Sequence, residues 1–272
     1  MQLTVKKTID IINSFAPFSL AENWDNSGLQ AGNPDWTIQK IMISLDVTME
    51  AMAAAKDWGA DLLLTHHPLL ISPEKSINFM KMPGSAICMA AKQNMSIVSA
   101  HTNLDKAING LNDYFAKMMG MDCHEPLLKD SRPEGSSDSG QGIGRICQLP
   151  AAIPFKDLIS QVKARLGLET IRMAGDLNLK VDKIALCTGS GGSLTNLFLE
   201  SCANVYITGD IKYHEARQIE EHNKGLIDVG HFASEVIVVD LLKKRLQQAL
   251  PSLGYDIKIK GFKKERDPFK TV

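Results

Sequence analysis

The chain has 272 residues, a length that predicts one large domain or two modest ones. Hydrophobic residues make up 44% and charged residues 22%, which is typical of a soluble globular protein. A net charge of -1 excludes a protein that coats nucleic acid or a membrane through bulk charge, although a local basic patch remains compatible with it. The N-terminus lacks the apolar run of a signal peptide and no stretch approaches the ~20 apolar residues of a membrane span, so we expect a cytoplasmic protein with no membrane partner.

The cysteines provide no motif. There are five of them, they are widely spaced and no two form a C-x-x-C pair. We therefore expect neither a disulfide framework nor a zinc ribbon, but ordinary buried thiols in a reducing compartment. The cysteines are Cys88, Cys123, Cys147, Cys187 and Cys202.

The first half of the chain alternates between short apolar runs and amphipathic segments. A helix is predicted to begin after Thr4, a suitable N-cap, and to end before Pro17, and a loop rich in turn formers follows at 22–33. This β-α-β-α order is typical of a mostly parallel sheet covered by helices. Strands are predicted at 41–45, 61–65 and 97–100, and helices at 48–58, 86–93 and 111–119.

A polar segment separates this half from a second run of the same kind. Residues 130–142 are rich in Ser, Gly, Asp and Pro and are predicted to be a linker. The fold class predicted is two-lobed α/β, with mostly parallel sheets flanked by helices. One lobe comprises 1–129 and 231–272, and the other comprises 143–230. In the second run, strands are predicted at 143–149, 170–173, 184–187, 205–208 and 226–229, helices at 154–166, 214–222 and 233–250, and a last short strand at 255–259.

Polar residues follow four of the apolar strands directly. Ligand sites in open α/β sheets gather outside the carboxyl ends of the strands, so these residues are the candidates for chemistry. The four groups are His66 with His67, His101 with Asp105, Asp210 with His214, and His231 with Glu235.

Metal binding explains these residue types. Imidazole and carboxylate ligands suit zinc, iron, manganese and similar divalent ions. Adjacent histidines point in different directions and so favour two neighbouring metals, which carboxylates can bridge. Residues four apart share one helix face. Paired metals activate water for hydrolysis. The five candidate ligands are His66, His67, Asp105, His231 and Glu235.

Four other features leave alternatives open. The loop Gly189–Gly192 could be a phosphate-binding nest, or a tight turn, since it lacks the lysine of a Walker A loop. The basic tail 258–270 could be a solvated end or a nucleic-acid contact. Asp46 could orient a site residue or cap the following helix, and Trp24 and Trp58 are expected to pack in the core or an interface.

Six sequence blocks follow one another between Asn23 and Glu235, which is nearly the whole chain. They read NWDNSGLQAG, THHPLL, AHTNLDKAINGLNDYFA, CTGSGGSL, TGDIKYHEA and GHFASE. In this order the blocks resemble the Nif-three-like family, also described as type 2 GTP cyclohydrolase I or as a dinuclear metal-centre hexameric protein. One departure is that Ile71 and Ser72 stand where an aromatic often follows the histidine pair.

The resemblance implies a two-lobed α/β subunit that assembles as a toroidal homohexamer with metal sites facing an internal cavity. Its metal ligands correspond to the five candidates chosen above. His101 and His214 match positions near the metals and are assigned to orienting ligands or to acid–base catalysis. Larger relatives carry an inserted domain between the lobes, and the short segment 130–142 resembles the compact form.

The function that the resemblance implies is a dinuclear metal-dependent hydrolase that opens the imidazole ring of GTP with metal-activated water. Its cofactors would be two divalent metal ions, and its partners would be other copies of itself and a nucleotide substrate. Two alternatives stay open. One is a two-metal phosphoesterase that acts on nucleotides, and the other is a non-enzymatic metal-binding or regulatory ring that contacts a protein or nucleic acid.

Overall fold

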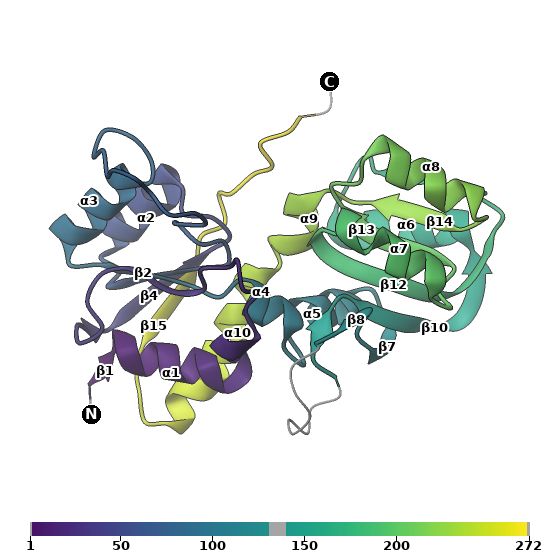
Figure 1. The fold of residues 1–272 in the computed structure, drawn as a ribbon. Coiled ribbons are helices and arrows are strands. Elements are labelled where there is room, and N and C mark those ends of the chain that lie inside the picture. The colour runs from purple at the N-terminus through teal and green to yellow at the C-terminus, as the bar shows by residue number, and fades with distance from the viewer. Residues whose placement is uncertain (1, 131–139, 271–272) are drawn as a thin grey trace. The chain divides into compact units, whose positions relative to one another are not determined.

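The computed structural model describes residues 2–130 and 140–270, which divide into two compact units (Figure 1). Unit 1 comprises Met1–Leu104 and Val238–Val272, and unit 2 comprises Asp105–Ile237. Each unit contains a β-sheet with helices on its faces, which confirms the predicted α/β class. Among the described residues, no helix combines the length and the apolar content that crossing a membrane requires.

The sheet of unit 1 has five strands, of which four are parallel. Its order is β15-β4-β5-β6-β2, and only β2 pairs in the antiparallel direction. The carboxyl ends of the parallel strands therefore lie at one edge. The strands are β2 (Gly28–Ala31), β4 (Lys40–Ser44), β5 (Leu62–Thr65), β6 (Ser96–Ser99) and β15 (Lys258–Gly261), and Leu3–Thr4 (β1) pairs separately with Thr37–Ile38 (β3).

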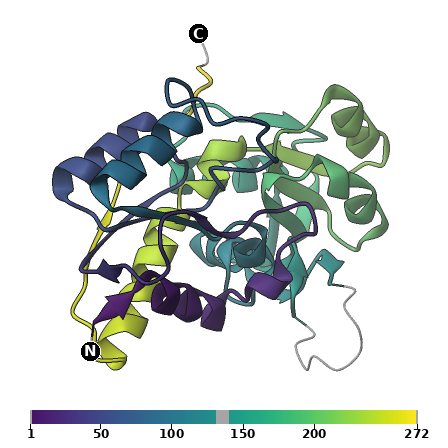
Figure 2. The same cartoon turned by 60° about the vertical axis from the view of Figure 1, so that its left-hand side comes forward.

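Helices cover both faces of this sheet (Figures 1 and 2). Helices α2 (Met49–Trp58) and α3 (Gly84–Gln93) lie on one face, and α1 (Val5–Phe15) and α10 (Val238–Ser252) lie on the other. Met42 packs with Met52 and Ala86 in the core under α2 and α3. Because successive strand residues point to opposite faces, a continuous apolar run is what a sheet covered on both sides requires.

The sheet of unit 2 is mixed rather than mostly parallel. Its order is β11-β14-β13-β12-β10-β7, and only β12, β13 and β14 are parallel to one another. The remaining pairs are antiparallel. The strands are β7 (Asp122–Glu125), β10 (Arg145–Pro154), β11 (Arg172–Ala174), β12 (Lys180–Ser190), β13 (Val205–Gly209) and β14 (Gly225–Asp228), and Leu128–Lys129 (β8) pairs separately with Gly142–Ile143 (β9).

Two apolar layers fill unit 2. Phe115 and Phe155 pack on one face of the sheet, from α5 (Leu111–Met118) and α6 (Phe155–Leu166). Phe198 and Ile219 pack on the other, from α7 (Thr195–Glu200) and α8 (Tyr213–Glu221). Two short helices carry predicted site residues, namely α4 (Thr102–Lys106) and α9 (His231–Glu235), while Phe18–Leu20 and Gly192–Leu194 form single 3₁₀ turns.

The boundaries of the two units differ from those of the predicted lobes. One lobe was predicted to comprise 1–129 and 231–272, and the other 143–230. Residues 105–129 belong to unit 2 because β7 pairs with β10 and Phe115 packs beside α6. Residues 231–237 also belong to unit 2, since α9 packs against β12 and β13. Of the predicted linker 130–142, residues 131–139 lie outside the described residues.

Three of the predicted elements that differ from the structure show why local patterns misplace them. The predicted helix 233–250 is two helices, α9 and α10, separated by a turn at Val236 and Ile237, which is where the chain passes from one unit to the other. The predicted loop 22–33 contains β2, which pairs with β6. The predicted strand 255–259 begins later, at Lys258, where pairing with β4 starts.

The expectation that the cysteines form no disulfide is wrong for one pair. Cys123 and Cys147 lie opposite each other on the antiparallel strands β7 and β10, and their sulfur atoms are bonded at 2.02 Å. A cross-strand pair leaves no spacing motif in the sequence, because its 24-residue separation is set by the path between the strands. Cys187 is buried as expected, whereas Cys202 is exposed and Cys88 is partly exposed.

Unit 2 contains a buried ion pair at the start of β10. The side chain of Arg145 is 3% exposed, and its Nε and Nη2 donate to the Asp113 carboxylate at 2.6 and 3.0 Å. The guanidinium also donates to the backbone carbonyls of Gly142, Gly144 and Ala107. The pair thereby ties α5 to β10 and to the chain that follows Asp105.

We expect Asp113→Ala to lower the free energy of unfolding by about 3 kcal/mol, because it leaves the buried Arg145 charge without its carboxylate. Urea unfolding followed by circular dichroism measures the change. Asp122→Ala, at an exposed position of β7, is the control and should change stability by less than about 0.5 kcal/mol. Equal effects of the two substitutions would contradict this account of the ion pair.

Candidate functional site

The histidine group of unit 1 lies where the parallel strands β5 and β6 end. His66 and His67 follow β5, and His101 follows β6. The parallel register of β5 with β6 brings these strand ends together. One ring nitrogen from each of the three histidines lies within 4.8 Å of the others, so together they could hold a metal ion. His101, which the sequence assigned to orienting ligands or to acid–base catalysis, is thus placed beside two predicted ligands.

Each ring in this group is fixed through its Nδ1 atom. His66 donates from Nδ1 to the carbonyl oxygen of Ala100 at 2.8 Å. His67 Nδ1 is 2.7 Å from Asp46 Oδ1, and His101 Nδ1 is 2.8 Å from Asp25 Oδ1. A carbonyl can only accept, so a neutral His66 ring carries its proton on Nδ1 and has a lone pair on Nε2. Hydrogen bonds of this kind orient metal-binding histidines.

The Asp46 contact resolves one alternative left open by the sequence. Its carboxylate binds the His67 ring, whereas Thr48 is the N-cap of α2 and accepts from the Ala51 N–H. Asp46 therefore orients the ring of His67, a predicted ligand, and Thr48 caps the helix.

Asp25 contacts the histidine group, and sequence reasoning missed it. Burial by itself would raise the pKa of Asp25, but hydrogen bonds from His101, Thr102 and Ser27 outweigh it and hold that pKa well below its usual range. Asp25 therefore stays ionised beside the His101 ring. The turn-rich segment around it was a signal, because short Asp, Asn and Ser side chains are typical of loops that present hydrogen-bonding groups.

Trp24, expected to pack in the core or an interface, is 61% exposed in unit 1. Its ring meets the His101 ring edge-on, with centroids 5.9 Å apart. Trp58, in contrast, packs beside the core under α2, and its ring lies 5.6 Å from the Lys40 ammonium group.

The second group of predicted ligands lies in unit 2, at the carboxyl ends of its parallel strands. His231 and Glu235 are the first and last residues of α9, one helical turn apart, with His231 Nε2 2.9 Å from Glu235 Oε2. His231 Nδ1 is 2.8 Å from Asp210 Oδ2, which leaves its Nε2 as the nitrogen that faces Glu235. Asp210 has a φ of 58°, a conformation that few residues other than glycine adopt.

Asp105 and Glu235 both lie close enough to Cys187 in unit 2 to act on its thiol. Burial raises the pKa of the Cys187 thiol, and the negative charges of Asp105 and Glu235 raise it further. Cys187 is therefore a neutral, inert thiol beside two carboxylates, and such a pair of acidic groups is suited to binding cations.

His214 is not brought into either group. It lies exposed in the first turn of α8, and its ring contacts the neighbouring Tyr213 ring, with centroids 5.3 Å apart. Asp210, four residues earlier, is the member of this sequence block that contacts a predicted ligand.

The glycine-rich loop Gly189–Gly192 lies directly against the unit 2 group. Gly189 has a φ of 68°, its N–H donates to Ser234 Oγ at 2.8 Å, and a Cβ atom there would be 2.1 Å from Glu235 Oε1. A Cβ atom at Gly192 would be 2.9 Å from the Glu215 carboxylate. Two carboxylates beside the loop disfavour a phosphate ligand, so these contacts favour the tight-turn alternative and explain why glycine is needed.

Comparisons with known proteins agree with this architecture. The family model described as Duf34/NIF3 (NGG1p interacting factor 3) matches residues 3–268. A Clostridium perfringens protein named GTP cyclohydrolase 1 type 2 homolog is 35% identical over 264 residues, covering 97% of this chain and 98% of the relative. A Helicobacter pylori protein named GTP cyclohydrolase 1 type 2 is 32% identical, covering 95% and 96%. The Staphylococcus aureus hypothetical protein SA1388 has a similar crystal structure, with a TM-score of 0.92, 25% identity and full coverage of both chains.

We expect Gly189→Ala to weaken metal binding at least about tenfold, because the added methyl group must displace the Glu235 carboxylate. Isothermal titration with Zn²⁺ measures the affinity. Gly167→Ala is the matched control, since Gly167 has nearly the same φ, 67°, but nothing lies within 4 Å of a Cβ atom there. Both variants incur the same left-handed strain, so an equal loss of affinity in the two would contradict the steric explanation.

Proposed function

This chain belongs to the Duf34/NIF3 family, and we propose that it is a metal-dependent hydrolase of the GTP cyclohydrolase 1 type 2 kind. The names of its relatives supply the reaction class. One observation in the structure supports a metal-dependent reaction above all others. The Nδ1 atoms of all three histidines proposed as ligands are each held by a carboxylate or a carbonyl, as in metal sites whose ligands bind through Nε2. These histidines are His66, His67 and His231.

The proposed cofactors are two divalent metal ions. We assign as ligands His66 and His67 of unit 1, and Asp105, His231 and Glu235 of unit 2. The donors are nitrogen and oxygen atoms without any cysteine sulfur, a set that suits catalytic zinc, manganese or iron. Bound ions of this kind lower the pKa of water and so supply a nucleophile for hydrolysis at neutral pH.

His101 is proposed to move protons during the reaction. An ionised Asp25 beside its Nδ1 atom stabilises the ring when the other nitrogen accepts a proton, as in other histidine–carboxylate pairs. Opening an imidazole ring by hydrolysis requires proton transfer to a ring nitrogen, which a histidine in this position is suited to perform. His214 is proposed to contribute to the same acid–base chemistry, and its exposed side chain is accessible to a substrate.

We also propose that the protein assembles with copies of itself as a homohexameric ring. Unit 1 exposes large apolar side chains on one loop, including Phe79 at 59% and Met80 at 88% exposure. Grouped apolar side chains of this kind favour burial against another protein surface. Ile71, Ile77 and Met82 are the other large apolar residues exposed on this loop.

We expect light scattering coupled to size-exclusion chromatography to give six times the 29.8 kDa mass of the chain. Met80→Asp should lower that mass, because a charge cannot be buried in an apolar contact without a partner. Leu177→Asp, at a 49% exposed position of unit 2, is the control and should leave the mass unchanged. A monomeric wild-type protein would contradict the proposed assembly.

The proposed activity is tested by incubating GTP with protein loaded with Zn²⁺, Mn²⁺ or Fe²⁺ and measuring formate. We expect formate release that a chelator abolishes and that added metal restores. His66→Ala and Glu235→Ala should reduce the rate to background, because each removes a proposed ligand. His222→Ala is the matched control, since His222 is exposed at the end of α8 and belongs to neither ligand group.

No formate release with any of the three metals would overturn the GTP cyclohydrolase assignment. Phosphomonoesters and dinucleotides are then the substrates to test, because two bound metals also suit phosphoester hydrolysis. Metal binding without turnover of any of these substrates would favour a non-enzymatic ring.

A further inference from the structure

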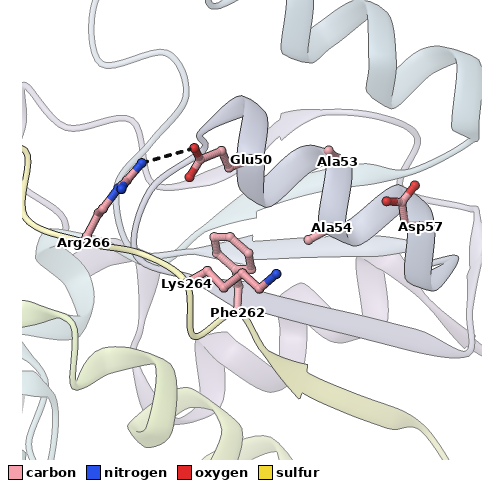
Figure 3. Close-up of a pocket in the computed structure, with 7 residues that line it drawn as sticks. All are labelled: Glu50, Ala53, Ala54, Asp57, Phe262, Lys264 and Arg266. Atoms are coloured by element: carbon pink, nitrogen blue, oxygen red, sulfur yellow. Dashed lines mark ion pairs between the residues drawn. The ribbon is translucent and has the colours of Figure 1, made fainter.

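The C-terminal segment is part of the sheet of unit 1 rather than a free tail. Strand β15 pairs in parallel with β4, and beyond it the Phe262 N–H donates to the Ile43 carbonyl at 2.7 Å. Phe262 is buried against the apolar core under α2. Figure 3 shows Phe262 below α2 near Ala54, and Arg266 reaching Glu50 on the same helix, an ion pair of 3.8 Å. The segment therefore follows the edge of β4 to its carboxyl end.

The Glu265 side chain binds the backbone just beyond the point where pairing between β15 and β4 ends. Its carboxylate accepts the Leu45 N–H at 2.8 Å through Oε2 and the Asp46 N–H at 2.9 Å through Oε1. These two N–H groups lie directly after β4, where backbone carbonyls of a neighbouring strand would otherwise accept them. Burial raises the pKa of Glu265, and the two N–H groups act in the opposite direction. The carboxylate thus takes the place of the backbone carbonyls that a longer β15 would supply to these two N–H groups.

The backbone held by Glu265 also holds a proposed metal ligand. Asp46 Oδ1 binds the His67 ring at 2.7 Å, and the Leu45 carbonyl accepts the His67 N–H at 3.0 Å. The Asp46 carbonyl accepts in addition from the Ser44 hydroxyl at 2.8 Å. A shift of Asp46 therefore changes the orientation of the His67 ring, and Glu265 is the acceptor that fixes the Asp46 N–H.

We propose that Glu265 is a positioning residue for His67, acting through Asp46, and that the C-terminal segment is therefore part of the metal-binding unit. This inference rests on the proposed function, because it takes His67 as a metal ligand. It also gives the segment a role other than nucleic-acid contact. The basic side chains of Lys263, Lys264 and Arg266 are exposed around a carboxylate that is turned inward.

The pocket beside this segment is lined by charged side chains, two of which pair with each other, so we propose no ligand for it. It has a volume of about 550 Å³ and lies between α2 and the segment (Figure 3). Charges of both signs line it, and Glu50 and Arg266 pair with each other. We therefore place the function of the segment at Glu265 and not in the pocket.

Glu265→Gln is the test, because it keeps the shape of the side chain but replaces one acceptor oxygen by an NH₂ group. Zn²⁺ affinity, measured by competition with a chromophoric chelator, should fall about tenfold, as for other groups that orient metal ligands. The ¹⁵N signals of the His67 ring should shift in the metal-free protein, which a purely stabilising role would not produce. Asp46→Asn should shift the same signals.

Asp267→Asn is the matched control, since the Asp267 carboxylate accepts the Phe269 N–H within the same segment. It should leave Zn²⁺ affinity and the His67 signals unchanged. Glu265→Asp keeps the charge with a shorter reach and should give an intermediate loss of affinity. If Glu265→Gln does not fold, the comparison of Glu265→Asp with Asp267→Asn decides the question.

The outcomes separate this inference from the proposed function. If the wild-type protein binds Zn²⁺ and Glu265→Gln binds it equally with unchanged His67 signals, the positioning role is overturned while the proposed function stands. If the wild-type protein binds no Zn²⁺, Mn²⁺ or Fe²⁺, the proposed function is overturned, and the inference falls with its premise.

Discussion

Parallel pairing brings the ends of β4, β5 and β6 to one edge of a sheet, and the histidine group of unit 1 depends on that alignment. Asp46, His67 and His101 follow three different strands, yet each contributes to one small region. In unit 2 the three parallel strands β12, β13 and β14 likewise end at one edge of the sheet, where Gly189, Asp210 and the start of α9 lie. The antiparallel strands extend each sheet but contribute no predicted ligand.

Hydrogen bonding then determines what these side chains can do. A histidine whose Nδ1 atom donates to a carbonyl or carboxylate has its ring orientation fixed, and Nε2 is then the nitrogen through which it can bind a metal. Asp25, Asp46 and Asp210 serve this purpose. Asp25 is held by the Thr102 hydroxyl at the start of α4, Asp46 is held by Glu265 of the C-terminal segment, and Asp210 has a positive φ. The backbone conformation of Asp210 is the kind of local strain that is found at functional sites.

Much of the fold could be predicted because its signals are local. Thr4, Thr48 and Gly59 mark helix ends through their own side chains or conformations, and the structure places the helix caps at these residues. The break between α9 and α10 could not be predicted, because the apolar stripe continues through it and only packing on different units separates the two helices. The Cys123–Cys147 pair was missed for the same reason, since strand register and not spacing brings the two residues together.

The sequence by itself determined the α/β class, the order of the elements and the residue types of the candidate site. Apolar periodicity and the chemistry of histidine and carboxylate are properties of short segments, so no tertiary structure is needed to recognise them. Only the tertiary structure decided which groups orient the histidines and why Gly189 must be glycine. It also decided that Glu265, in a basic tail, accepts the N–H groups that follow β4. These depend on contacts between residues up to 220 positions apart, which the folded backbone alone brings within hydrogen-bonding distance.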